Sequence, residues 1–171
     1  MKNIYLIGFM GCGKSTIGKR LERLTGHELI EMDETIESQQ GMKIAQIFEQ
    51  FGEEGFRRME TGLIEEISGR GGCIVSCGGG AVLRAENVAL MKNNGVIVLL
   101  ETTPEVIYER VKDSYARPLL NGHMSVEYIR ELMEKRNAAY LAAADYVVDA
   151  DKTPGRIALE IAELLHDELE A

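Results

Sequence analysis

The chain has 171 residues, of which 45% are hydrophobic and 27% charged, which suits one folded domain and excludes a disordered chain. Its formal charge of −9 argues against nucleic acid and anionic membranes as partners, because both require a basic face. No apolar stretch is long enough for a membrane span and no export or anchoring signal is evident. We therefore expect a cytoplasmic protein without nucleic-acid or membrane partners. We also expect a monomer that acts on small molecules.

Short apolar runs alternate with amphipathic stretches along the whole chain, without internal repeats or linkers. This alternation is typical of a single α/β domain, over residues 1–171, in which helices cover a parallel sheet. The expected strands are residues 3–7, 27–32, 72–77, 95–100 and 146–149. The expected helices are residues 14–24, 33–39, 44–51, 54–69 and 84–93, with three more beginning after the capping residues Thr103, Ser125 and Thr153.

Residues 8–15 read GFMGCGKS and lie between an expected strand and an expected helix, as a P-loop requires. Its glycines let successive amides turn toward phosphate oxygens, while Lys14 reaches the β and γ phosphates and the Ser15 hydroxyl binds Mg²⁺. We therefore expect ATP and Mg²⁺ as cofactors, and a phosphoryl-transfer enzyme. A P-loop alone does not separate kinases from GTPase switches and ATPases, and it does not identify the acceptor. The guanine-reading sequence N-K-x-D is absent.

An arginine shares the apolar face of the helix expected to begin after Ser125. Helical spacing places Arg136 in one stripe with Ile129, Met133 and Tyr140. Burying a guanidinium costs several kcal/mol unless an anion pairs with it. Arg136 therefore either binds an anionic ligand, or pairs with a carboxylate or reaches the helix edge.

Arg57 presents a similar case beside the core stripe of the expected helix 54–69. Glu60 lies one turn further on and is placed to hold the Arg57 guanidinium. A solvated charge cluster explains this segment nearly as well, because other acidic and basic residues surround it.

Three consecutive glycines, Gly78, Gly79 and Gly80, directly follow an expected strand. Such a run has a conformational cost and lets the backbone approach a ligand, so we expect a ligand-facing loop. In a parallel sheet, the carboxyl end of this strand faces the same crevice as the P-loop.

Taken together, seven segments carry a resemblance to the shikimate kinase family from Asn3 to about Arg156: IGFMGCGKSTIGKRL, MDETI, IFEQFGEEGFRRMET, SCGGGAVLR, ARPLL, EKRNAAY and ADYVVD. The resemblance implies a three-layer P-loop fold with a five-stranded parallel sheet of the nucleoside monophosphate kinase type. It implies a substrate-binding region at about residues 33–61 and a mobile lid at about residues 113–124. It also implies transfer of the ATP γ-phosphoryl group to the 3-hydroxyl of shikimate, on the route to chorismate and the aromatic amino acids.

The resemblance further implies roles for single residues on the substrate side. Asp33 holds the shikimate hydroxyls and helps to orient the attacking one. Arg57 and Arg136 bind the shikimate carboxylate. The resemblance therefore implies that the anion paired with Arg136 is the substrate. The implied substrate contacts are completed by the backbone of Gly78, Gly79 and Gly80.

On the nucleotide side, the resemblance implies that Lys14 and the lid residue Arg117 neutralise charge during transfer, so that Lys14, Asp33 and Arg117 form the catalytic set. The implied nucleotide contacts are Gly11, Cys12, Gly13, Lys14, Ser15, Thr16, Arg110, Arg117, Thr153 and Arg156. The chain departs from the family at Glu31, where the pattern D-x-D has aspartate. We therefore expect Ser15 to bind the metal directly and Glu31 to lie in its outer shell.

Two other kinds of protein remain open on the sequence. One is a related small-molecule kinase that acts on gluconate or a nucleoside monophosphate. The other is a catalytically silent nucleotide-binding module, in which Glu31 marks a decayed metal site.

Overall fold

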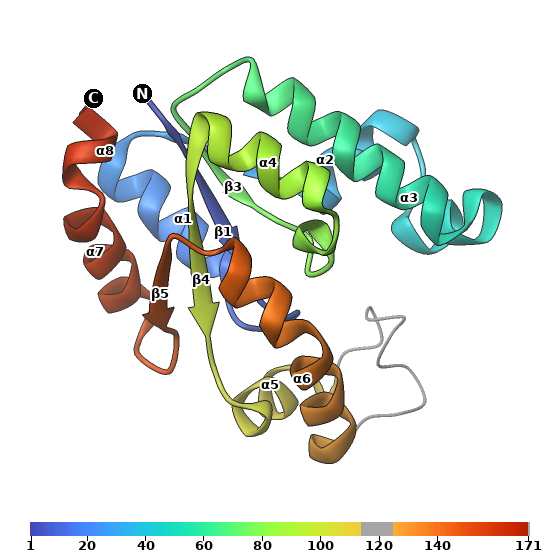
Figure 1. Cartoon of the computed structure of the whole chain (residues 1–171). Helices are drawn as coiled ribbons and strands as arrows, with labels where there is room; N and C mark the ends of the chain where they lie inside the picture. Colours follow the sequence, from blue (N-terminus) through green and yellow to red (C-terminus); the bar gives the residue numbers. More distant parts are fainter. Residues whose placement is uncertain (114–124, 171) are drawn as a thin grey trace.

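A five-stranded parallel sheet forms the centre of the protein in a computed structural model that describes residues 1–113 and 125–170 (Figure 1). The strand order is β2-β3-β1-β4-β5. The strands are β1 (Asn3–Ile7), β2 (Glu28–Glu31), β3 (Cys73–Ser76), β4 (Gly95–Glu101) and β5 (Tyr146–Asp149). The expected five-stranded parallel sheet is confirmed, and each predicted strand end lies within one residue of the observed end.

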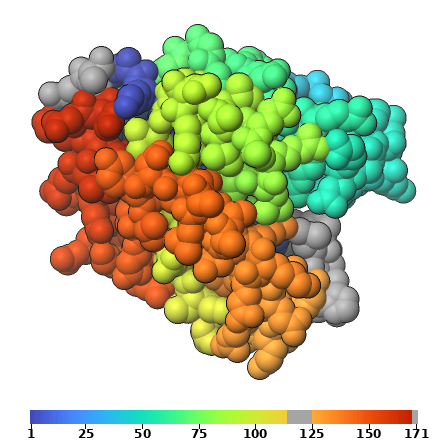
Figure 2. All heavy atoms as spheres, in the orientation of Figure 1, coloured from blue at the N-terminus to red at the C-terminus, as the bar shows by residue number. Residues whose placement is uncertain are grey.

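The three central strands, β3, β1 and β4, are buried on both faces up to Glu101, as their uninterrupted apolar runs require. Helices α1 (Lys14–Thr25) and α7 (Pro154–Leu164) pack together on one face, while α4 (Ala85–Asn94) and α6 (Val126–Ala143) pack on the other (Figure 1). Figure 2 shows α4 and α6 side by side on this second face, with α3 (Ile44–Ser68) extending to the side. This arrangement is the expected three-layer fold.

The remaining helices connect these layers. Helix α2 (Met32–Gln40) follows β2 directly and packs against α3, and α5 (Pro104–Val111) packs against α6. A short 3-10 helix, η1 (Ala81–Leu83), and a terminal helix, α8 (His166–Glu170), were not expected from the sequence. Both are only one turn or so long, so neither shows a periodic pattern.

The expected helix caps are confirmed in two of three cases. Thr103 accepts a hydrogen bond from the Val106 amide at 3.4 Å, and Ser125 accepts one from the Tyr128 amide at 3.1 Å. Thr153 precedes α7 in an extended conformation, but its side chain makes no capping bond. The proline that follows Thr153 fixes the helical φ and needs no amide donor, so α7 begins there without a side-chain cap.

Helix α3 contains the two helical segments that the sequence predicts, joined at Gly52. Gly52 has φ 70° and ψ 177°, a conformation outside the helical region that its lack of a Cβ permits. The second segment carries the predicted apolar stripe, in which Phe56, Leu63 and Ile67 are buried. The kink therefore separates the first part of α3 from the part that bears Arg57 and Glu60.

Candidate active site

The P-loop connects β1, the central strand, to α1. Gly8, Gly11 and Gly13 all have positive φ, and a Cβ on Gly8 would lie 2.7 Å from the Leu100 carbonyl oxygen. The loop is closed by a 3.1 Å hydrogen bond from the Cys12 amide to the Phe9 carbonyl. Positive φ disfavours residues other than glycine at all three positions, and the close contact also excludes a side chain at Gly8. The motif thus folds as a glycine-rich loop between β1 and α1.

Lys14 lies inside this loop rather than in solvent. Its Nζ donates to the carbonyl oxygens of Gly8 and Phe9, at 2.7 and 3.1 Å. These bonds hold the ammonium group within the loop, where Lys14 lines the neighbouring cleft.

A cleft of about 450 Å³ opens beside the loop. Its lining brings together elements from both ends of the chain, and includes Lys14, Ser15, Glu31, Asp33, Gly78, Gly79, Arg110 and Lys152. The predicted residues Gly11, Cys12, Gly13 and Thr16 also line it. Its volume and its oxygen-rich and cationic lining suit a nucleotide and a small polar acceptor.

Ser15 and Glu31 form a polar pair at one side of the cleft. The Ser15 hydroxyl donates to Glu31 Oε2 at 2.9 Å, while Glu31 Oε1 is buried and has no hydrogen-bond partner among the described residues. A buried carboxylate oxygen without a donor suits a cation, so the pair fits the expected Mg²⁺ position. Residues 1–113 and 125–170 contain no cluster of three metal-ligating side chains, which agrees with Mg²⁺ taking its other ligands from phosphates and water.

The three glycines of the loop at residues 78–80 each face a charged side chain. A Cβ on Gly78 would lie 2.5 Å from Glu60 Oε2 and 3.3 Å from Asp33 Oδ1. A Cβ on Gly80 would lie 2.5 Å from both terminal nitrogens of Arg57. The absence of side chains at residues 78–80 therefore makes room for the charged groups as well as for a ligand. We call residues 78–81 the glycine loop.

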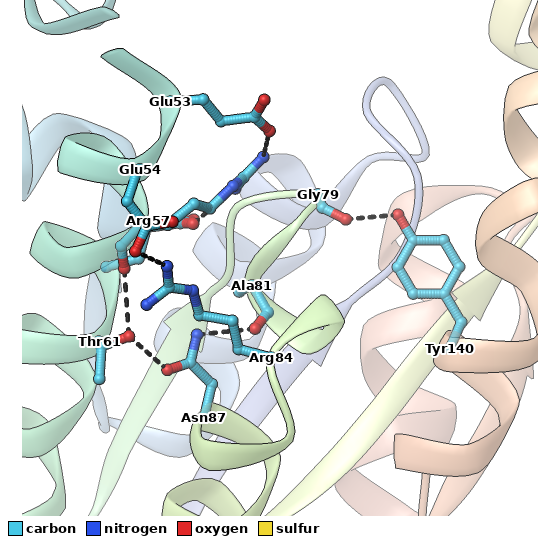
Figure 3. Close-up of polar contacts among 10 residues, drawn as sticks. Glu53, Glu54, Arg57, Thr61, Gly79, Ala81, Arg84, Asn87 and Tyr140 are labelled. Atoms are coloured by element: carbon cyan, nitrogen blue, oxygen red, sulfur yellow. Dashed lines mark hydrogen bonds and ion pairs between the residues drawn. The ribbon is translucent and has the colours of Figure 1, made fainter. Parts of the chain in front are cut away.

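Arg57 is held by two carboxylates on its own helix, of which the sequence predicts Glu60. Figure 3 labels the other, Glu53. Its Nη1 lies 2.5 Å from Glu60 Oε1 and its Nη2 lies 3.3 Å from Glu53 Oε1. Burial raises the pKa of the fully buried Glu60 carboxyl above its ordinary value, although Arg57 opposes this shift. The solvated-cluster alternative is thus wrong for Glu60, which lies in the interior.

Arg136 lies against the same loop from α6. Its Nη1 would be 3.4 Å from a Cβ on Gly79, and its guanidinium carbon lies 5.8 Å from the centre of the Phe9 ring. Among the described residues, no carboxylate lies within ion-pair distance of this half-buried guanidinium. A cation in this position favours an anionic ligand, the first of the two interpretations of Arg136.

Tyr140, one helical turn beyond Arg136, is buried, and its hydroxyl donates to the Gly79 carbonyl at 2.6 Å (Figure 3). Burial raises the pKa of Tyr140, so the hydroxyl stays protonated and remains a donor. The predicted inward stripe is confirmed, because Ile129 and Tyr140 are buried while Met133 and Arg136 are half-buried.

Arg110 contacts the P-loop from α5. Its Nη1 donates to the Cys12 carbonyl at 2.9 Å, and its Nη2 to the Ala150 carbonyl at 3.4 Å. These bonds join the P-loop to the segment after β5, where Lys152 lines the cleft. Thr153 and Arg156 are exposed at the start of α7 and do not themselves line it.

The lid expected at about residues 113–124, including Arg117, lies outside the described residues except at its first position. Lys152 was not predicted, because a lysine in a polar connection after a strand resembles an ordinary solvated charge. Two further residues were also missed. Asn87 donates to the glycine loop, and Thr61 of α3 donates to Asn87. Their partners are distant in sequence, so no local pattern marks them.

Comparison with known proteins identifies the family. A family model described as shikimate kinase matches residues 10–166. The chain is 42% identical over 170 residues to a shikimate kinase from Thermodesulfovibrio yellowstonii, covering 99% of this chain and 96% of that one. It is 44% identical to a shikimate kinase from Sulfurihydrogenibium sp., with 94% and 96% covered. The chain belongs to the shikimate kinase family.

Solved structures agree with this assignment. A shikimate kinase from Acinetobacter baumannii, in complex with shikimate, superposes with a TM-score of 0.92 at 34% identity, covering 98% of this chain and 94% of that one. A gluconokinase from Sinorhizobium meliloti superposes with a TM-score of 0.57 at 19% identity, with 98% and 97% covered, and shows the shared fold alone. The family assignment is thus favoured over the gluconate and nucleoside monophosphate alternatives.

As a member of the shikimate kinase family, the protein is an ATP-dependent small-molecule kinase that uses Mg²⁺. None of its described helices combines the length and the apolar character needed to cross a bilayer.

Proposed function

We propose that this protein transfers the γ-phosphoryl group of ATP to the 3-hydroxyl of shikimate, giving shikimate 3-phosphate and ADP on the route to chorismate and the aromatic amino acids. One observation carries the proposal: Arg57 on α3 and Arg136 on α6 approach neighbouring glycines of one loop beside the P-loop cleft. Two guanidinium groups at one loop suit a carboxylate, because each offers paired donors in fixed geometry.

The substrate side of the cleft is assigned on this basis. Arg57 and Arg136 bind the carboxylate of shikimate, and the backbone of residues 78–80 contacts its ring substituents. Asp33, in the first turn of α2, lines the cleft and orients the attacking hydroxyl. Phosphoryl transfer depends mainly on such positioning and on charge neutralisation.

The nucleotide side is assigned to the P-loop and its neighbours. Lys14 and the P-loop amides bind the phosphates, while Ser15 holds Mg²⁺ directly and Glu31 lies in its outer shell. When bound, the metal would supply positive charge that offsets the negative charge of the phosphates. Arg110, Thr153 and Arg156 contact the nucleotide from α5 and α7, and Arg117 adds positive charge over the phosphates.

We further propose one domain over residues 1–171, with the substrate-binding region at about residues 33–61 and a lid at about residues 113–124. The sheet and its single buried core support one domain. We expect the protein to act as a monomer in the cytoplasm.

The test is an ADP-release assay with ATP, Mg²⁺ and a panel of acceptors: shikimate, gluconate and nucleoside monophosphates. We expect rapid ADP formation with shikimate alone, and a new phosphomonoester signal in the ³¹P spectrum of the product. ADP formation with gluconate or a nucleoside monophosphate instead would overturn the acceptor. Binding of ATP without any acceptor-dependent ADP would favour the silent module.

A further inference from the structure

The glycine loop at residues 78–81 is held at two carbonyls by side chains from two different helices (Figure 3). Tyr140 of α6 donates to the Gly79 oxygen at 2.6 Å, and Asn87 of α4 donates to the Ala81 oxygen at 2.8 Å. Both side chains are buried, with 5% of Tyr140 and none of Asn87 exposed. The Asn87 bond is buried and the Tyr140 bond is partly buried, so losing either bond leaves a polar group with restricted access to water unpaired.

Asn87 also reaches α3 through Thr61. The Thr61 hydroxyl donates to Asn87 Oδ1 at 2.8 Å and lies 3.1 Å from the Arg57 carbonyl oxygen. The orientation of the Asn87 amide is determined by these partners, because only its nitrogen can donate to Ala81. A hydrogen-bonded path thus runs from Thr61, one helical turn after Arg57, through Asn87 to the glycine loop.

Thr61 and Tyr140, which anchor the loop to α3 and α6, have the same sequence spacing from the two site arginines. Thr61 lies four residues after Arg57 on α3, and Tyr140 lies four residues after Arg136 on α6. Residues four apart are neighbours on one helix face. The loop is therefore tied to both arginine-bearing helices one turn beyond each guanidinium group.

All four carbonyls of this loop have donors. The Gly78 oxygen accepts from the Ala81 amide at 3.0 Å and the Gly80 oxygen from the Leu83 amide at 3.1 Å, in addition to the two side-chain bonds. A trans peptide is planar, so the amide of the following residue points opposite to each carbonyl. Fixing the Gly79 carbonyl therefore also fixes the direction of the Gly80 amide.

We propose that Tyr140 and the Asn87–Thr61 pair are positioning residues for shikimate. These residues aim the Gly80 amide and fix the position of the glycine loop relative to Arg57 and Arg136. The inference rests on the proposed function, since it assigns these residues to the shikimate half of the cleft. It differs from a purely structural role, because it requires a loss of shikimate affinity without a loss of ATP affinity.

The first test is Tyr140→Phe, which removes one oxygen atom, with Tyr5→Phe as the matched control. Tyr5, in the middle of β1, is fully buried, and its hydroxyl donates to Asn94 Oδ1 at 2.8 Å. Both variants should melt at a lower temperature. We expect only Tyr140→Phe to raise the shikimate KM, by about tenfold for the loss of one buried hydrogen bond, with the ATP KM unchanged.

The second test is the pair Thr61→Val and Thr61→Ser. Valine keeps the shape but leaves Asn87 Oδ1 unpaired, whereas serine retains the hydroxyl. We expect Thr61→Val to raise the shikimate KM severalfold and Thr61→Ser to restore the wild-type value. This pair tests the attachment through α3 even if Tyr140→Phe does not fold.

Titration of the ¹⁵N-labelled protein with shikimate alone completes the experiment. In the wild type, the Gly80 amide signal should shift on binding, and the shift should shrink in Tyr140→Phe. If Tyr140→Phe and Thr61→Val melt at lower temperatures but bind shikimate as tightly as the wild type, the positioning role is overturned and the proposed function stays intact. A wild-type protein that neither binds nor phosphorylates shikimate would overturn the proposed function itself.

Discussion

Arg57 and Glu60 form an ion pair with a 2.5 Å contact, in which the carboxylate is fully buried and 12% of the guanidinium side chain remains exposed. The other oxygen of Glu60 is buried without a partner among the described residues, next to Gly78. The arginine thus faces the cleft loop while its counter-ion lies in the interior. A buried carboxylate of this kind makes stability depend on pH.

We expect Glu60→Gln to change the pH dependence of stability. Burial raises the folded-state pKa of Glu60 above its ordinary value of 4.5. The contribution of Glu60 to the free energy of unfolding is therefore fully present below about pH 4.5, and it is lost as the pH rises through the raised pKa of the folded state. Urea unfolding across this range should show the stability of the wild type falling with pH relative to Glu60→Gln.

Glu65→Gln is the control for this experiment, because Glu65 is exposed on the same helix. Its stability should run parallel to that of the wild type at every pH. A difference between wild type and Glu60→Gln that stays constant, or grows with pH, would contradict the raised pKa.

We expect Arg136→Ala to weaken shikimate binding by about 1.5 to 3 kcal/mol, the range for a charged hydrogen bond, which corresponds to about 10- to 150-fold. Arg136→Lys keeps the charge but loses the forked geometry, so it should recover only part of this loss. Calorimetry with shikimate and separately with ATP measures both affinities. A collapse of ATP binding with unchanged shikimate affinity would rule out the carboxylate role.

Much of the fold could be predicted from the sequence, because strands buried on both faces appear as short apolar runs between helical stretches. The strand 3–7, which is buried throughout, and the kink between residues 51 and 54 are examples, since composition and a glycine mark them locally. The helix from His166 was missed because a single terminal turn has no periodicity. Local chemistry thus determines the elements that are long enough to have a pattern.

The candidate site could be predicted only in part. Lys14 and Ser15 lie in a contiguous motif, and Arg136 stands out as a charge on an apolar stripe. Asn87 carries no such signal, because a polar residue on a helix is usually solvated and its bond to Thr61 spans 26 positions. Contacts of this length depend on how α3 and α4 pack, which no local pattern encodes.

We expect Glu31→Gln to weaken metal binding without unfolding the protein. Glutamine keeps the length of the side chain but removes the charge of the buried oxygen that faces no donor. Mn²⁺ affinity in the presence of ADP, measured by electron paramagnetic resonance, should fall by about tenfold, as is typical for outer-shell groups. Glu31→Asp, which keeps the charge, should remain within about threefold of the wild type. Equal Mn²⁺ affinity in all three proteins would remove Glu31 from the metal site.

We expect Lys14→Ala to lower turnover by at least about a thousandfold while leaving the fold and shikimate binding intact. The loop keeps its shape in this variant, because its positive-φ glycines and the Cys12 to Phe9 bond belong to the backbone. Lys19→Ala is the matched control, since Lys19 is exposed on the same helix and should retain full activity. Coupled ADP release measures turnover, and calorimetry measures shikimate binding. A fully active Lys14→Ala enzyme would show that the ammonium group inside the loop does not act on the transferred phosphate, and the role of the P-loop would have to be abandoned.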